Sequence, residues 1–270
     1  MNFFRNFLAS FLGSITALIL IISLGFFLLA GIASVATFDK NILQDQISSN
    51  SVLNLDLDKD IYDNIPITQE FEEILGVSPE IIKFLDLINA IEFASNNNDI
   101  KGINLKSQSP KMGWSQALTI RKSLQNFRDK GKFIYSYRDF FSQKGYYLAS
   151  VSDSIFLNPM GNIELRGLGA EVLYYKQLQE KYGFKMEVVR HGKYKSAVEP
   201  YLDDKMSEAN RNQIKSLLNS IWDGIANQIK SSRKISPENF NEVVDNLDAT
   251  FPENAYRNNI VDGIVSKTQY

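Results

Sequence analysis

The segment from Gly192 to Pro200 gathers several side chains that could take part in catalysis. Its sequence is Gly-Lys-Tyr-Lys-Ser-Ala-Val-Glu-Pro, and it follows a predicted strand over 185–190, where α/β folds place functional loops. A lysine acts as a general base only in its neutral form, which burial or a positive neighbour favours. Lys193 could be the positive neighbour that lowers the pKa of Lys195 by charge repulsion. Ser196 could orient the Lys195 side chain by a hydrogen bond. Local composition also allows a second interpretation, in which the segment is a solvated basic loop.

His191 is the only histidine, and the 270 residues contain no cysteine. A Ser-His-Asp triad would therefore depend on this one residue, and a transition-metal site would need carboxylates instead. Disulfide scaffolds, zinc ribbons and thiol enzymes are excluded. His191 is otherwise an ordinary residue at a strand end, and the sequence predicts neither a metal nor a cofactor.

Two further segments could hold a nucleophile and its oxyanion hole. Ser142 precedes a predicted helix that begins near Gly145, where free backbone N–H groups could stabilise an oxyanion. The alternative is that Ser142 only caps the helix. The turn over 107–113, Ser-Gln-Ser-Pro-Lys-Met-Gly, could present N–H groups to an anion, although one glycine is a weak indication of such a cradle.

Alternating strands and helices must position these residues. Apolar periodicity predicts strands over 51–57, 100–105, 132–137, 154–157 and 185–190, and helices over 79–94, 117–129, 145–150, 172–182 and 207–231. A turn is expected at Pro159–Gly161, and Ser207 with Glu208 is expected to cap the last helix. This order predicts an α/β layered domain with mostly parallel strands.

Charge divides the chain into an apolar head and a soluble body. The sequence has 29 Lys and Arg against 31 Asp and Glu, and of these only Arg5 lies within residues 1–38. The uncharged run is long enough to span a bilayer, and Arg5 indicates a cytoplasmic N-terminus with the body outside. Ser34-Val35-Ala36 leaves a cleaved signal peptide as the alternative. The slightly acidic body, without a basic block, argues against nucleic-acid binding.

Taken together, the motifs resemble the signal peptide peptidase A (protease IV) family, peptidase family S49, in its long two-repeat form. The most specific part runs from Gly192 through Pro200 to Asp203-Asp204-Lys205-Met206-Ser207. The Gly145-Tyr146-Tyr147 helix and the ending Asn259-Ile260-Val261-Asp262-Gly263 also match. The resemblance covers about residues 50 to 265. It implies a crotonase/ClpP-like α/β repeat over 51–270, after a cytoplasmic tip and transmembrane anchor over 1–38 and a tether over 39–50.

The family's serine–lysine dyad implies that Lys195 is the general base. Single-repeat members carry Ser-Gly-Gly-Tyr-Tyr, whereas here Gln143 stands in the serine position and Ser142 is one residue out of register. The family's Ser-Pro-Gly-Gly turn is Ser109-Pro110-Lys111-Met112. Both losses affect the nucleophile half, which is the pattern of a first repeat whose serine lies in a second repeat.

The resemblance further implies a homotetrameric serine endopeptidase of the bacterial inner membrane that degrades cleaved signal peptides. Its partners would be those peptides, the lipid bilayer and the second repeat. Two alternatives stay open: a non-catalytic peptide-binding or scaffold module, and an acyl-CoA enzyme on the same fold. The orientation predicted from Arg5 argues against the acyl-CoA enzyme, because coenzyme A is cytoplasmic.

Overall fold

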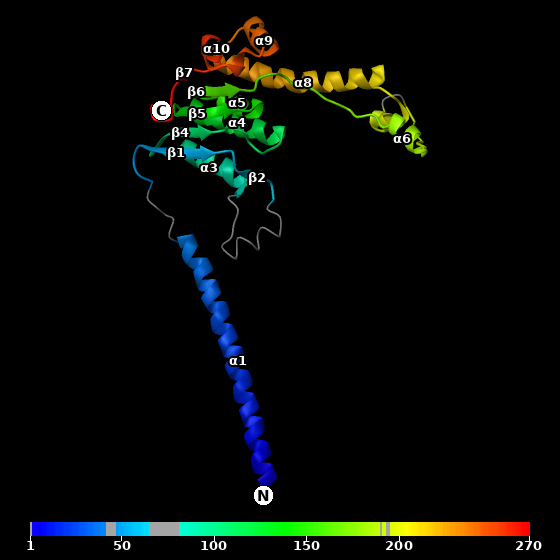
Figure 1. The fold of residues 1–270 in the computed structure, drawn as a ribbon. Helices are drawn as coiled ribbons and strands as arrows, with labels where there is room; N and C mark the ends of the chain where they lie inside the picture. Colours follow the sequence, from blue (N-terminus) through cyan, green and yellow to red (C-terminus); the bar gives the residue numbers. More distant parts are fainter. Residues whose placement is uncertain (1, 42–46, 65–80, 190, 193–194) are drawn as a thin grey trace. The chain divides into compact units, whose positions relative to one another are not determined.

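The computed structural model describes residues 2–41, 47–64, 81–189, 191–192 and 195–270 (Figure 1). Contacts divide the chain into two units, one comprising 1–48 with 66–79 and the other 49–65 with 80–270. In the first unit, α1 (Asn2–Asn41) is a single helix whose stretch Phe3–Leu28 is long and apolar enough to cross a membrane. The apolar head is therefore helical, as its composition predicted.

The second unit is built on a parallel sheet of five strands in the order β1-β4-β5-β6-β7. The strands are β1 (Ser51–Asp56), β4 (Ile100–Lys106), β5 (Phe133–Phe141), β6 (Ser154–Ile163) and β7 (Gly263–Ile264). Two short parallel strands, β2 (Asp60–Tyr62) and β3 (Ile81–Lys83), form a separate sheet. The predicted α/β class with parallel strands is confirmed.

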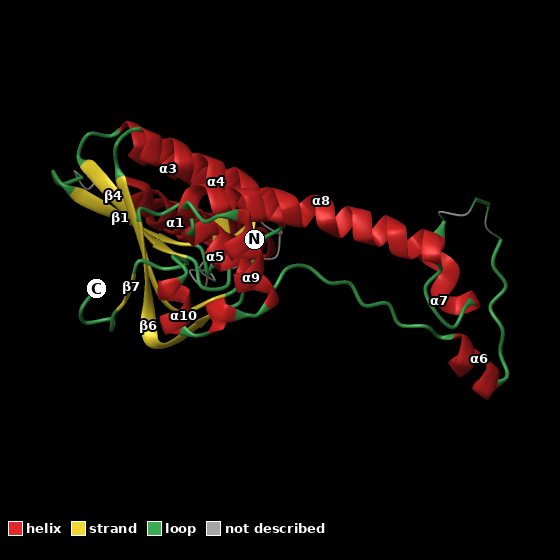
Figure 2. Cartoon of the chain, turned by 90° about the horizontal axis from the view of Figure 1, so that it is seen from above, coloured by secondary structure: helices red, strands yellow, loops and turns green. Residues whose placement is uncertain are grey.

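Three helices pack on one face of the five-stranded sheet: α3 (Phe84–Asn96), α4 (Trp114–Asp129) and α5 (Gln143–Ala149) (Figure 2). In α4 the buried residues Ala117, Ile120, Leu124 and Phe127 recur at helical spacing and meet the inward side chains of the strands, such as Ile103 and Ile134. This apolar layer holds the turns that follow β4 and β5 in fixed positions.

The rest of the chain forms helices α6 (Lys176–Tyr182), α7 (Glu199–Leu202), α8 (Glu208–Arg233), α9 (Pro237–Asp245) and α10 (Pro252–Arg257), with 3-10 turns η1 (Ser196–Val198) and η2 (Asp248–Thr250). Ser207 caps α8 as predicted, its Oγ accepting the N–H of Asn210. α6 and α7 lie beside the N-terminal end of α8 (Figure 2). We call the described residues of 176–211 the lysine lobe, because they include Lys195; they comprise α6, η1, α7, the first turn of α8 and the connections between them.

Several predictions of local structure were wrong. The helix expected over 79–94 begins at Phe84, because residues 81–83 form the strand β3, and the helix expected over 172–182 begins at Lys176. The strand expected over 185–190 is irregular backbone over its described residues, 185–189. The turn expected at Pro159–Gly161 lies within β6, whose pairing with β5 shifts register between Arg138 and Phe140. Such an irregularity lets a strand continue past a proline that cannot donate to the ladder.

Candidate active site

The turn after β4 and the start of α5 form one tightly joined unit. The Ser142 N–H donates to the carbonyl of Gln108 (2.8 Å), and the Ser107 hydroxyl donates to the carbonyl of Gly145 (3.1 Å). A Cβ added to Gly145 would lie 2.2 Å from the Ser107 carbonyl oxygen. Only glycine fits there, because the helix approaches the turn more closely than any side chain allows.

Ser142 caps α5. Its Oγ accepts the N–H of Gly145 at 3.1 Å, and its backbone is extended, as at other N-caps. Of the two interpretations of Ser142 that the sequence allowed, the structure therefore supports the helix cap.

The turn over 107–113, where an oxyanion hole was considered, is occupied by side chains of the chain itself. The Ser109 N–H donates to Asp58 Oδ1 (2.7 Å), and the other carboxylate oxygen accepts from Arg138 (2.7 Å). Lys144 Nζ donates to the Met112 carbonyl, and its ammonium lies 5.5 Å from the centre of the Trp114 ring. Burial lowers the pKa of Lys144 below its ordinary value. A carboxylate thus takes the place that an anionic ligand would need.

Gln143, which the family resemblance sets at the serine position, is committed to the backbone that follows β6. Its Oε1 accepts the N–H groups of Arg166 (3.0 Å) and Gly167 (2.9 Å), and its Nε2 donates to the carbonyl of Gly167 (2.9 Å). All three bonds have good geometry, and they join α5 to the segment that leads away from β6.

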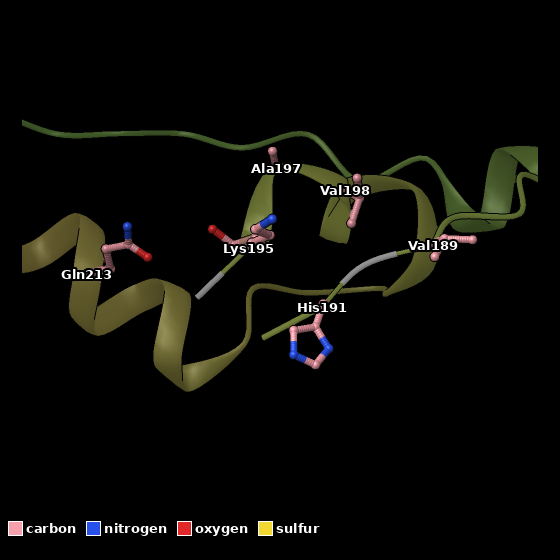
Figure 3. Close-up of a pocket in the computed structure, with 7 residues that line it drawn as sticks. Val189, His191, Lys195, Ala197, Val198 and Gln213 are labelled. Atoms are coloured by element: carbon pink, nitrogen blue, oxygen red, sulfur yellow. The ribbon is translucent and has the colours of Figure 1, made fainter. Parts of the chain in front are cut away.

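Lys195 lies elsewhere, on the lysine lobe. It is exposed and lines a cavity of about 450 Å³ that is also bordered by Val189, His191, Ser196, Ala197, Val198 and Gln213. Figure 3 shows His191, Lys195 and Gln213 around this cavity. The structure therefore brings Lys195 and His191 to one cavity, and neither Ser142 nor the 107–113 turn lines it. Lys193 lies outside the described residues.

A buried carboxylate, which the sequence interpretation left without a role, organises this lobe. Glu199 is 1% exposed, and its two oxygens accept the Ser207 hydroxyl (2.5 Å), the Ser207 N–H (3.2 Å) and the amide of Asn210 (3.0 Å). Glu199 is the first residue of α7, and these bonds fix α7 against the start of α8. A glutamate within Ser-Ala-Val-Glu-Pro, eight residues before a helix cap, was the sequence signal that could have revealed it.

Gln179 is the second internal support that the sequence did not reveal. Its Nε2 donates to the carbonyl of Tyr201 (2.8 Å), and its Oε1 accepts the N–H of Met186 (2.8 Å). The rings of Tyr175 and Tyr201 stack beside it, with centroids 5.6 Å apart. Side chains, rather than a sheet, therefore give the lobe its shape.

The sequence was also compared with known proteins. The model of Peptidase family S49 matches residues 126–270. Protease 4 of Salmonella typhi is 34% identical over 175 residues, which are 62% of this chain and 28% of that protein. Protease 4 of Haemophilus influenzae is 32% identical over 225 residues, 81% of this chain and 36% of that protein. The chain thus spans about a third of the length of these relatives.

A solved structure, that of the 1510-N membrane-bound stomatin-specific protease, superposes with a TM-score of 0.41 at 13% identity, covering 82% of this chain and 83% of the other. The family assignment follows from the sequence match, which takes in more than half of the chain, with α5, the lysine lobe and α8. The chain belongs to peptidase family S49.

Proposed function

We propose that this chain is the lysine-donating repeat of a membrane-anchored serine endopeptidase, with Lys195 as general base and a serine supplied by a second repeat. One observation carries the proposal. The serine position is filled by Gln143, whose amide makes three hydrogen bonds to the 166–167 backbone, while Lys195 stays exposed beside a cavity. The chain therefore offers a base and keeps no nucleophile of its own at the family position.

The chemistry of the assembled site follows from the dyad. The serine Oγ attacks the peptide carbonyl carbon while the neutral amine of Lys195 takes the hydroxyl proton, and the proton passes to the leaving amine as the C–N bond breaks. Water then hydrolyses the acyl ester by the same base. Burial favours the neutral amine, and Lys195 is exposed in this chain, so the second repeat has to cover it.

The proposed substrates are cleaved signal peptides, which are apolar and held at a membrane. α1 supplies a segment of matching length and composition for anchoring the enzyme to the bilayer. Arg5, the only charge before Asp39, supports a cytoplasmic N-terminus and a body on the outer face of the bacterial inner membrane. The proposal includes the homotetramer that the family resemblance implies.

The test uses the detergent-solubilised assembly purified from its native membrane. A fluorophosphonate probe labels only an activated serine, so we expect it to label a serine-bearing second repeat. Lys195→Ala should abolish both the labelling and the hydrolysis of an apolar signal peptide. Lys205→Ala removes an exposed lysine from the same lobe and should change neither. Equal labelling of the wild-type and Lys195→Ala assemblies would show that Lys195 is not the base.

A second candidate function is a non-catalytic peptide-binding module of the same fold. The contact between Asp58 and the Ser109 N–H favours it, because that carboxylate blocks an anion-binding turn. This alternative predicts that the purified assembly binds signal peptide and that no polypeptide in it reacts with the fluorophosphonate.

A further inference from the structure

Two stretches of chain connect the lysine lobe to the sheet. One is the segment over 164–175, which runs from β6 to α6 as a long loop (Figure 2). The other is α8, which buries Ile225, Ala226 and Ile229 toward its C-terminal end, whereas Leu217 and Ile221, nearer the lobe, are exposed. The path of the first connection therefore helps to decide where the lobe and its lysine are held.

The 164–175 connection stops pairing with β5 at the point where Gln143 begins to contact it. The last backbone bond between it and β5 is donated by the Glu164 N–H to the Phe141 carbonyl (2.8 Å). After Phe141 the chain turns into α5, so no strand continues beside residues 166–167. The Gln143 amide takes that place, since it offers the same donor and acceptor as a peptide group.

Gly167 completes this arrangement. Its φ of +82° allows the N–H groups of two successive residues, Arg166 and Gly167, to converge on the single Oε1 atom of Gln143. Serine at position 143 could not do the same, because it is two atoms shorter and has no amide nitrogen to meet the Gly167 carbonyl.

Beyond Gly167 the connection is tied again only where it reaches the lobe. Within the described part of the chain, the backbone over 168–174 makes no backbone hydrogen bond, and the next one is donated by the Tyr175 N–H to the Pro200 carbonyl (2.6 Å). Pro200 lies five residues after Lys195, in α7. The connection is therefore fixed at its root by Gln143 and at its far end beside the lysine motif.

We propose that Gln143 is a positioning residue for Lys195: its amide fixes the root of the 164–175 connection and so restricts where the lysine lobe can lie. The residue at the lost serine position thus acts on the base through the chain and not on the substrate. This inference rests on the proposed function for its catalytic meaning, and its structural part can be tested without any activity.

The structural test exploits the absence of native cysteines. Spin labels at Lys101→Cys on β4 and Lys205→Cys on the lobe report the distance between sheet and lobe in the full chain. We expect a narrow distance distribution in the wild-type background and a broad one in Gln143→Ala, with faster amide exchange at residues 166 and 167. Gln125→Ala removes a glutamine whose amide donates to Asp129 within α4, and it should leave both measurements unchanged.

Gln143→Glu provides the chemical control in a single protein. Its neutral carboxyl has a donor and an acceptor, as the amide does, whereas its carboxylate accepts the two N–H groups and repels the Gly167 carbonyl. Relative to the wild type at the same pH, we therefore expect equal exchange and an equally narrow distribution near pH 4, and faster exchange and a broader distribution near pH 8. A distribution that is equally narrow in Gln143→Ala, or insensitive to pH in Gln143→Glu, would overturn the inference.

In the native assembly, Gln143→Ala should slow fluorophosphonate labelling roughly 10- to 100-fold, because the base is no longer held in place. Unchanged labelling together with a broadened distribution would show that Lys195 is positioned by other contacts and would also overturn the inference. If the proposed function itself is wrong, the result is different: the Lys195→Ala assembly is labelled as fully as the wild type.

Discussion

The phenol of Tyr146 donates a 2.8 Å hydrogen bond to the carbonyl oxygen of Ile260, 114 residues further along the chain. The two residues belong to the Gly-Tyr-Tyr and Asn-Ile-Val-Asp-Gly motifs. Asp262 strengthens the same junction, because its Oδ2 accepts the Ile155 N–H (2.8 Å) and its carboxylate pairs with Arg233 through two 2.9 Å bonds. The closing motif therefore fastens the end of the chain to α5 and β6.

This junction predicts a sensitivity to high pH. Tyr146 is fully buried, and burial raises its pKa above the ordinary value of 10. Above pH 10 the unfolded phenol ionises while the folded one keeps its proton, so stability is complete below that pH and falls as the pH rises. The loss is about 1.4 kcal/mol for each pH unit until the folded group titrates.

Tyr146→Phe should remove that slope. At pH 7 the variant should lose about 1 kcal/mol through the missing hydrogen bond, and between pH 10 and 11 its urea midpoint should fall less than that of the wild type. Tyr256→Phe, at an exposed site on α10, is the matched control and should follow the wild-type profile. Parallel profiles for wild type and Tyr146→Phe would contradict the prediction.

A buried guanidinium holds α4, α5 and α8 together. Arg121 is 4% exposed, donates to the Tyr147 carbonyl and the Ser150 hydroxyl on one side, and donates to the Gln228 carbonyl and the Ser232 hydroxyl on the other. Burial lowers its pKa to about 10, so the group stays charged at neutral pH.

Arg121→Lys should therefore be costly, because one ammonium cannot reach both helices that the guanidinium fork joins. We expect a loss of roughly 2–4 kcal/mol in the free energy of unfolding, measured by urea denaturation of residues 49–270 or of the full chain in detergent. Arg257→Lys on the exposed face of α10 should lie within about 0.5 kcal/mol of the wild type. A similarly small effect for Arg121→Lys would show that the fork is not needed.

Features that depend on neighbouring residues in the sequence could be predicted. Ser207 caps α8 because a hydroxyl reaches an N–H three residues later, which is a purely local relation. β1, β4, β5 and the helices α3, α4 and α5 follow in the same way from their apolar periods, and the parallel sheet follows from their alternation. The short strands β2 and β3 were not predicted, and β3 lies where a helix was expected.

Features that depend on residues far away in the sequence could not be predicted. Residues 185–189 alternate in polarity as a strand does, yet the N–H of Met186 pairs with the side chain of Gln179, and Met186 and Val189 remain exposed. Alternation predicts a strand only where a sheet edge is available to pair with it. The role of Gln143 was equally hidden, because its partners lie 23 and 24 residues away.

Glu199 should control the integrity of the lysine lobe. Its carboxylate accepts from donors on Ser207 and Asn210, whereas the amide introduced by Glu199→Gln would turn a donor toward one of them. We expect a cost of roughly 2–3 kcal/mol and faster amide exchange in α7 and the first turn of α8. Glu208→Gln, at the exposed first turn of α8, should leave exchange in α7 unchanged, and equal protection in both variants would refute this role.

Restoring a serine at the family position should not restore a peptidase in this chain. In Gln143→Ser the turn next to α5 would keep its Ser109 N–H bonded to Asp58 and its Met112 carbonyl bonded to Lys144. An oxyanion at this point would lie beside a carboxylate, which destabilises it. We therefore expect no fluorophosphonate labelling of the purified chain carrying Gln143→Ser, and none when Asp58→Asn is added, because Lys195 lines a separate cavity. Labelling of Gln143→Ser that disappears on adding Lys195→Ala would instead show that one repeat can assemble the whole dyad.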